Sequence, residues 1–195
     1  MIPRALLPLA LLGAVVVTGT AQAQTDRSRP TAMIAGGPEV GRKAPDFSLA
    51  WANKDTTGGA EEPFGLWKTR GQTVVVAFYP RDFTPSGETM LRTLAAQQDS
   101  LAVQDLVIVG ISPDSLESHR KFAASVGVPF LLLSDPGQQV ARRYAARDEG
   151  GANRRAVYVI APDGKVAWRD LRFGVNDPRA YRDLRAAVRR VARRG

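Results

Sequence analysis

Four short apolar runs recur along the chain, separated by longer mixed segments. They cover residues 73–79, 106–111, 130–133 and 156–160. Continuous runs of this length, rich in β-branched, leucine or aromatic residues, are typical of strands that are buried on both faces of a sheet. Residues 46–51 instead alternate apolar and polar positions, which predicts a strand with one exposed face.

The segments between these runs have helical spacing. A helix is predicted after Thr84, which is a good N-cap residue. A second helix is expected over 116–126, because its apolar residues recur at helical spacing and Gly127 is suited to end it. The pairs Asp135-Pro136 and Asp177-Pro178 each introduce a further helix, and the last of these carries a regular apolar stripe.

The remaining elements are a loop and a hairpin. Residues 53–62 are polar and contain glycine, which indicates a loop. The turn Ala161-Pro-Asp-Gly164 joins the fourth apolar run to a strand over 165–168. The predicted order is therefore β-β-α-β-α-β-α-β-β-α, which favours an α/β domain whose central mixed sheet has helices on both faces.

The first residues have the pattern of an export signal. Arg4 is followed by an apolar stretch over 5–17 and by the small-residue sequence Ala21-Gln-Ala23. This pattern predicts a cleavable signal peptide over 1–23 and a periplasmic or secreted protein. The apolar stretch is short for a membrane span, although an uncleaved anchor is the alternative. Residues 24–40 then form a predicted flexible leader, and residues 41–195 form the predicted domain.

Composition removes several kinds of chemistry. The 195 residues include no cysteine and a single histidine, His119. Thiol catalysis, disulfides and thiolate metal sites are therefore excluded, and a metal centre built on imidazoles is not expected. We expect neither a metal nor another cofactor. The spacing of His119 predicts a helix-face residue rather than a ligand.

The net charge is +8, and arginine supplies most of it. The charge is spread along the chain without a basic-aromatic motif, so nucleic-acid binding is not predicted. The last predicted helix is coated with arginines, which we interpret as its solvated face. The alternative is that they bind an acidic partner or an anionic membrane surface. These arginines are Arg182, Arg185, Arg189, Arg190, Arg193 and Arg194.

The segment over 78–88 (F-Y-P-R-D-F-T-P-S-G-E) runs from a buried strand into the start of a helix. Active sites of open α/β sheets lie at such places, and the helix start favours negative charge. The segment resembles the active-site sequence F-Y-P-x-D-x-T-P-G-C-T of peroxiredoxins. These are proteins of the alkyl hydroperoxide reductase C and thiol-specific antioxidant type. The similarity is greatest to their bacterioferritin-comigratory or peroxiredoxin Q subgroup.

Four further stretches resemble the same family in the same order: 40–49, 109–122, 130–136 and 155–164. The resemblance spans 40–168. It implies a thioredoxin-like fold of the peroxiredoxin type and thioredoxin-dependent peroxide reduction as the family activity.

The resemblance also implies which residues form the site. The family's active-site proline, threonine, cysteine and arginine fall on Pro80, Thr84, Gly87 and Arg155, so the reacting cysteine is replaced by glycine. The second cysteine of many subgroup members falls on Arg92. Peroxide reduction in the family uses a thiolate that becomes a sulfenic acid. The chain therefore lacks the atom on which that chemistry depends.

Two functions remain open for such a site. Thr84, the helix start at Gly87 and the guanidinium of Arg155 would form a pocket for a small anion or a peroxide-like ligand. Alternatively, the protein is a redox protein that works with the thiol of a partner. Ser86 would need a nearby base to act as a nucleophile, so a serine hydrolase is not predicted.

Overall fold

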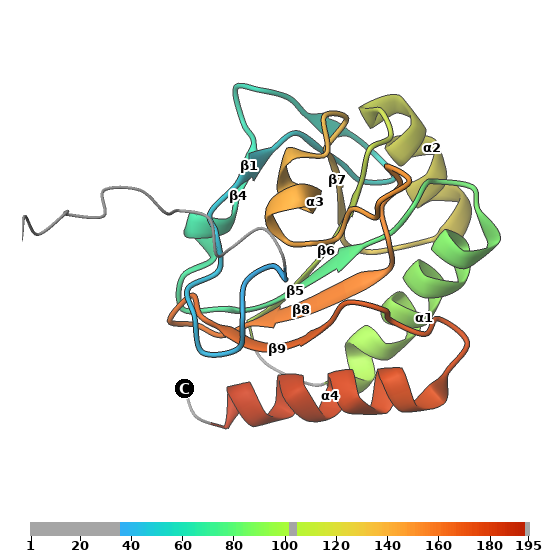
Figure 1. The fold of residues 1–195 in the computed structure, drawn as a ribbon. Coiled ribbons are helices and arrows are strands. Elements are labelled where there is room, and N and C mark those ends of the chain that lie inside the picture. Colours follow the sequence, from blue (N-terminus) through green and yellow to red (C-terminus); the bar gives the residue numbers. More distant parts are fainter. Residues whose placement is uncertain (1–35, 102–104, 194–195) are drawn as a thin grey trace, which may run out of the picture.

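A seven-stranded mixed sheet forms the centre of the molecule (Figure 1). The computed structural model describes residues 36–101 and 105–193. Strands β5 (Thr73–Phe78), β6 (Leu106–Ser112) and β7 (Leu131–Ser134) are parallel neighbours in the middle of the sheet. On one side the sheet continues with β8 (Ala156–Ile160) and β9 (Val166–Asp170), and on the other with β2 (Trp51–Ala52) and β3 (Thr57–Gly58). These four outer strands pair antiparallel with their neighbours, which gives the order β3-β2-β7-β6-β5-β8-β9.

Two hydrophobic cores lie on opposite faces of this sheet. Successive side chains of a strand point to opposite faces, and in β5 Val75 and Ala77 join one core while Val74, Val76 and Phe78 join the other. Helices α1 (Pro85–Leu101), α2 (Leu116–Val126) and α4 (Pro178–Ala192) pack on the first face. The short helices α3 (Gln139–Arg143) and η1 (Leu66–Thr69) cover the second. The predicted α/β architecture with helices on both faces is confirmed.

Local capping explains where the helices begin and end. The side chain of Ser115 accepts a hydrogen bond from the Ser118 amide at the start of α2, and Gly127 ends that helix with φ of 69°. Asp177 caps α4 in the same way, with Pro178 in its first turn. A side chain at Gly127 would be strained in this left-handed conformation, so glycine fits there.

Three parts of the fold differ from the sequence-based expectation. The single strand expected over 46–51 is divided between β1 (Ser48–Leu49) and β2, which belong to different sheets. β1 pairs with β4 (Phe64–Gly65), whereas β2 pairs with β3 and β7. The expected loop over 53–62 contains β3, and the elements β4 and η1 were not predicted. These pieces are two to four residues long, too short for a periodic pattern to reveal.

The predicted signal peptide and most of the predicted leader lie outside the described residues. Within the described part of the chain, no helix is both long enough and apolar enough to span a membrane.

Candidate ligand site at the edge of the sheet

The segment that resembles an active site lies at one edge of the sheet. The parallel strands β5, β6 and β7 all end at this edge, and β8 begins there because it is antiparallel and pairs Ala156 with Phe78. Pro80 follows β5, and Arg155 directly precedes β8. The topology thus brings together two predicted site residues that are 75 positions apart in the sequence.

Thr84 and Gly87 are joined at the start of α1. The hydroxyl of Thr84 donates to the carbonyl of Arg81 over 2.8 Å and accepts from the Gly87 amide over 3.2 Å. Thr84 is therefore the N-cap of α1, as predicted. The single hydrogen of this hydroxyl is used within the loop, so the hydroxyl has none left to donate to an anion.

Gly87 is enclosed by the same loop. A Cβ atom at this position would lie 2.7 Å from the carbonyl oxygen of Arg81, 2.9 Å from Oγ1 of Thr84 and 3.3 Å from the ring of Tyr79. Such contacts are shorter than van der Waals distances, and one involves backbone. The space that a cysteine side chain would need is therefore closed in this structure.

Two adjacent hollows open at this edge and share Pro80 and Ala152 as walls. The larger, which we call the arginine cavity, has a volume of about 440 Å³. Its other lining residues are Asp148, Asn153, Arg154, Arg155, Leu171 and Arg172. The smaller has a volume of about 320 Å³ and includes Thr84 in its wall. Pro80 borders both hollows, Thr84 and Arg155 line different ones, and Gly87 lines neither.

Arg92, which the resemblance matches to the second cysteine of many subgroup members, connects two helices. Its Nε donates to Glu88 over 2.9 Å, four residues earlier on α1. Its two Nη atoms donate to the carbonyls of Ser125 and Val126 at the end of α2, each over 3.1 Å. Helix ends leave such carbonyls without intrahelical partners, so Arg92 has a structural role here.

His119 belongs to a buried polar cluster beside the loop over 80–84. Its Nδ1 lies 2.9 Å from Oδ2 of Asp82, and its Nε2 lies 3.2 Å from the carbonyl oxygen of Leu133. Both side chains are almost completely buried. Because a carbonyl only accepts, Nε2 carries the hydrogen in its contact with Leu133, and the other ring nitrogen faces the carboxyl group of Asp82.

Two hydroxyls complete the hydrogen bonding of Asp82. Tyr79 donates to Oδ1 and Ser118 donates to Oδ2, each over 2.7 Å. Burial, and then the nearby Asp82 carboxylate, raise the pKa of Tyr79 well above its ordinary value, so the phenol retains its proton. The cluster fixes the loop to α2. Both nitrogens of His119 already face other groups, and no imidazole base is directed at Ser86.

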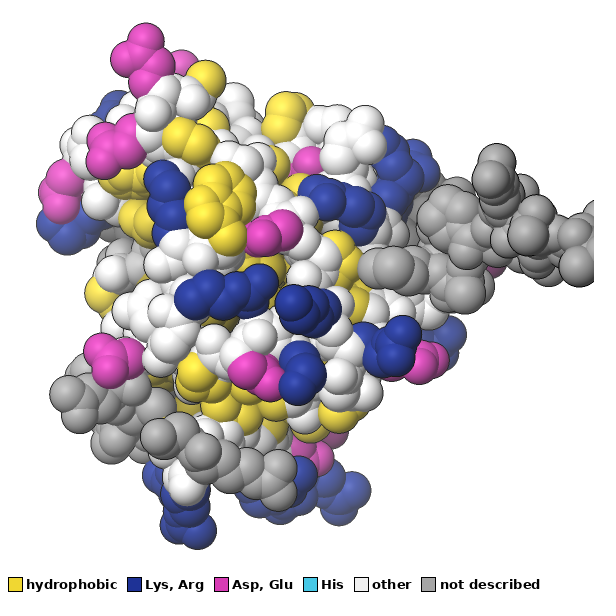
Figure 2. Space-filling view, turned by 90° about the vertical axis from the view of Figure 1, so that its left-hand side faces the viewer, with side chains coloured by type: hydrophobic (Ala, Val, Ile, Leu, Met, Phe, Trp, Pro, Cys, Tyr) yellow, Lys and Arg dark blue, Asp and Glu magenta, His cyan; other side chains and the backbone are white. Residues whose placement is uncertain are grey.

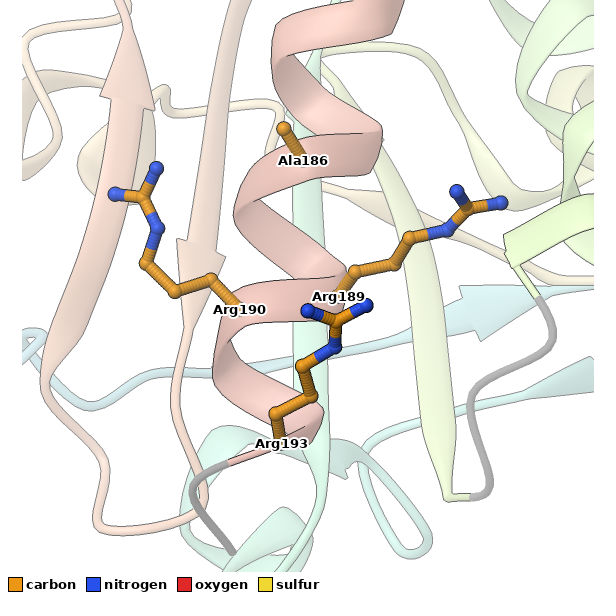
Figure 3. A pocket seen from close by; sticks show the side chains of 4 residues that line it. All are labelled: Ala186, Arg189, Arg190 and Arg193. Atoms are coloured by element: carbon orange, nitrogen blue, oxygen red, sulfur yellow. The ribbon is translucent and has the colours of Figure 1, made fainter.

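The arginines of α4 form an exposed basic face. Arg189, Arg190 and Arg193 surround Ala186 and line a shallow hollow of about 450 Å³. Figure 3 shows the side chains of Arg189 and Arg190 extended to opposite sides of the helix, so the three guanidinium groups do not converge on one point. Arg185 donates to Oε1 of Gln97 over 2.8 Å. Arg194 lies outside the described residues.

The other charges are more evenly distributed. On the face seen in Figure 2, Lys and Arg side chains are interspersed with acidic and apolar ones. In the described parts of the chain, no group of three or more His, Asp or Glu side chains is placed to hold a metal ion.

Sequence reasoning missed the partners of several residues at this site. Asp82 lies within the segment over 78–88, and its spacing gave no sign that it would pair with His119. Asn153, Arg154 and Arg172 line the arginine cavity but stand in segments without a periodic pattern. The only available signal was their position next to Arg155 and after β9, at the edge where the other site residues gather.

The fold and this edge define a thioredoxin-like α/β protein of the peroxiredoxin type. The AhpC/TSA family model matches residues 40–169. The chain is 38% identical over 106 residues to peroxiredoxin Bcp of Bacillus subtilis (strain 168), covering 54% of this chain and 63% of that protein. It is 35% identical over 128 residues to chloroplastic peroxiredoxin Q of Sedum lineare, covering 65% of each.

Solved structures show the same similarity. The bacterioferritin comigratory protein of Xanthomonas campestris superposes with a TM-score of 0.65 and 25% identity, covering 75% of this chain and 92% of that one. Enterococcus faecalis AhpC superposes with a TM-score of 0.67 and 23% identity, over 77% and 92% of the two chains, which supports the fold alone. The chain belongs to the AhpC/TSA family and contains no cysteine. It matches slightly less than two thirds of the length of the two curated relatives named above.

Proposed function

We propose that this protein is a peroxiredoxin-family member that does not reduce peroxides with a thiol of its own and instead binds a small anion at the edge of the sheet. The first part follows from chemistry. Glycine has no side chain that could be oxidised, and the hydroxyl of neighbouring Ser86 has no oxidation state that corresponds to a sulfenic acid.

The arginine cavity is the observation that carries the second part. Three arginines line it, namely Arg154, Arg155 and Arg172, whereas Asp148 is its one acidic lining residue. Guanidinium groups form strong, charge-assisted hydrogen bonds with carboxylate and phosphate oxygens. The Thr84 hydroxyl is occupied within the loop, so the proposed contacts to the anion come from the arginine side of the edge.

Isothermal titration calorimetry with small carboxylates and oxyanions tests the anion site. The comparison is between the wild type, Arg155→Ala and a control, Arg120→Ala, which removes an exposed arginine from α2. We expect Arg155→Ala to weaken binding about tenfold or more, whereas the control binds like the wild type. Absence of binding to the wild type, or equal binding by all three, would contradict the proposal.

The alternative is a redox protein that uses a partner's thiol. A peroxidase assay with thioredoxin, its reductase and hydrogen peroxide separates the two functions. The proposed binding function predicts no turnover above the rate without the protein. Turnover that depends on thioredoxin would favour the alternative.

We also propose that the protein is exported, on the basis of the signal-like pattern over 1–23. Expression of the full chain in a Gram-negative host, followed by fractionation and mass spectrometry, tests this. The expected result is a periplasmic protein that begins at Gln24. An intact N-terminus in the cytoplasmic fraction would contradict export.

The basic face of α4 is proposed as a second contact surface, for an acidic protein or an anionic membrane. Its exposed arginines, Arg179, Arg182, Arg189, Arg190 and Arg193, are accompanied by one acidic residue of the helix, Asp183. Co-sedimentation with anionic and neutral vesicles over a salt series distinguishes the two partners. Retention on anionic vesicles that decreases with salt would support the membrane, and absent retention would exclude it.

A further inference from the structure

Val40 is an exposed apolar side chain in a turn near the start of the described chain. Its exposed fraction is 58%. The Arg42 amide donates to the carbonyl of Glu39 over 3.1 Å and closes the turn, in which Gly41 has φ of 85°. These are the features of a type II turn, whose third residue favours glycine. The Gly41 amide also donates to the carbonyl of Val166 over 2.8 Å, so the turn is fixed to β9.

This turn lies beside the C-terminal part of α4. Val40, Arg190 and Val191 line one hollow of about 310 Å³ together with residues of the β8–β9 hairpin. Arg190 also lines the shallow hollow around Ala186, so the two hollows adjoin. Figure 1 shows the start of the described chain and this hairpin near the C-terminal end of α4. We call the combined area the turn–helix surface, and it consists of Val40, Lys165, Ala186, Arg189, Arg190, Val191 and Arg193.

The turn–helix surface is positively charged. The three arginines of α4 in it are exposed, and Lys165 adds a fourth basic side chain. Among the described residues that line the two hollows, Asp163 is the one acidic side chain, and its carboxylate lies 2.9 Å from Nζ of Lys165. Glu39 of the turn is a second acidic neighbour. Basic side chains therefore outnumber acidic ones, and the partner of this surface must carry negative charge.

The arrangement of the charges favours a flat partner. A single phosphate or carboxylate is held by donors that converge on it. The side chains of Arg189 and Arg190 instead extend to opposite sides of the helix, as Figure 3 shows. A bilayer with anionic headgroups offers negative charge along a whole plane, so it can meet divergent side chains simultaneously.

The apolar part of the surface also fits a bilayer better than an acidic protein. Protein interfaces derive most of their binding energy from anchors packed in desolvated central pockets. At the centre of the three arginines lies only Ala186, in a shallow hollow. Surfaces that bind membranes combine basic residues with apolar ones that enter the boundary between headgroups and acyl chains. Val40 provides such an apolar residue at the side of the basic helix.

The position of this surface determines how the molecule would lie. β8 begins with Ala156 at the edge that carries the arginine cavity and ends with Ile160. The hairpin that follows, and with it the turn–helix surface, therefore lies at the opposite end of the strand. A partner bound there leaves the arginine cavity open to solvent.

We infer that the turn–helix surface docks the protein on an anionic lipid bilayer, with Val40 in the boundary between headgroups and acyl chains and the arginine cavity on the aqueous side. This inference rests on the proposed contact surface of α4. It selects the membrane as the partner and adds the contact of Val40 and the orientation.

Site-specific fluorescence tests the contact and the orientation. The chain contains no cysteine, so a single introduced cysteine can carry one label. Val40→Cys and Ala152→Cys, each labelled with the environment-sensitive fluorophore NBD, are mixed with vesicles of phosphatidylglycerol and phosphatidylcholine. Ala152 is exposed in the wall of the arginine cavity. We expect the emission at position 40 to increase and shift to shorter wavelength, because the probe leaves water, whereas the emission at position 152 should not change.

Two matched double variants test the charges. Arg190→Gln with Arg193→Gln removes two charges from the turn–helix surface, and Arg120→Gln with Lys121→Gln removes two exposed charges from α2. A basic residue near an anionic membrane contributes about a fivefold gain in binding. In co-sedimentation we therefore expect the first variant to bind about 25-fold more weakly than the wild type and the second to bind like it. Binding through another part of the chain would not respond to the first variant.

The outcomes separate this inference from the proposed contact surface. Equal weakening in both double variants would overturn both, because the binding would then follow net charge alone. Binding that needs the arginines of α4 without a spectral change at position 40 would overturn the inference and leave the basic face standing. A spectral change at position 152 would overturn the orientation. Absence of binding to the anionic vesicles would overturn the inference and leave an acidic protein as the partner of α4.

Discussion

Substitution of Gly87 by alanine gives the sharpest test of the loop geometry. At an ordinary position inside a helix this change stabilises a protein by about 1 kcal/mol, because glycine loses more backbone entropy on folding. Here the new Cβ would lie 2.7 Å from the Arg81 carbonyl and 2.9 Å from Oγ1 of Thr84. Each of these atoms is held, because the two are hydrogen-bonded to each other over 2.8 Å.

The expected magnitude follows from what must move. Overpacking against backbone costs about 1–3 kcal/mol, and loss of the Thr84 cap costs about 1 kcal/mol. Set against the gain of about 1 kcal/mol, the net effect is a destabilisation of about 1–3 kcal/mol. For a chain of this length that corresponds to a decrease of about 2–12 °C in Tm.

Urea unfolding followed by circular dichroism measures the effect. Ser86→Ala changes the neighbouring residue of the same helical turn and serves as the control, for which we expect less than about 0.5 kcal/mol. In the double variant Thr84→Ala, Gly87→Ala one of the two close contacts is absent, so the cost of the alanine at position 87 should be smaller. A stability gain of about 1 kcal/mol in Gly87→Ala alone would refute the closed loop.

Three further predictions concern stability. Asp82→Asn should destabilise the protein by about 1–3 kcal/mol in urea unfolding, because the buried hydrogen bonds of Asp82 with Tyr79, Ser118 and His119 would be disrupted; an unchanged stability would contradict the structural role of the cluster. Thr84→Ala should lower the free energy of unfolding by about 1 kcal/mol, whereas Thr84→Ser should resemble the wild type, and equal values for both would argue against the cap. Burial raises the pKa of Asp135 above its ordinary value of about 3.8, so folding favours the protonated carboxyl group. The free energy of unfolding should therefore decrease as the pH increases from about 3.8 through the raised pKa. Unfolding curves over pH should show this decline in the wild type relative to Asp135→Asn, and a difference independent of pH would contradict it.

Local patterns in the sequence predict most of the main elements. The apolar run over 73–79 corresponds to β5 together with Tyr79, the residue that follows it, and all of these residues are buried. The run is apolar after its first threonine because both faces of this strand are covered. The cap of α1 at Thr84 and the end of α2 at Gly127 follow from residue chemistry that acts within a few positions. Short strands such as β3 and β4 were missed, since two residues are too few to show a periodic pattern.

The site shows the same limit. The resemblance placed Pro80, Thr84, Gly87 and Arg155 in one region, but it could not reveal that the loop closes over Gly87. That closure depends on the direction of a single backbone carbonyl. Asn153, whose side chain accepts a hydrogen bond from Gln138, was also beyond prediction, because no periodic pattern encodes a contact between two such side chains.

Consumption of hydrogen peroxide by the purified protein, supplied with thioredoxin and its reductase, tests the central claim most directly. A chain without any cysteine should leave the rate of NADPH oxidation at the level measured without it. Sustained oxidation that increases in proportion to the amount of this protein, in a preparation free of other thiol peroxidases, would contradict the account.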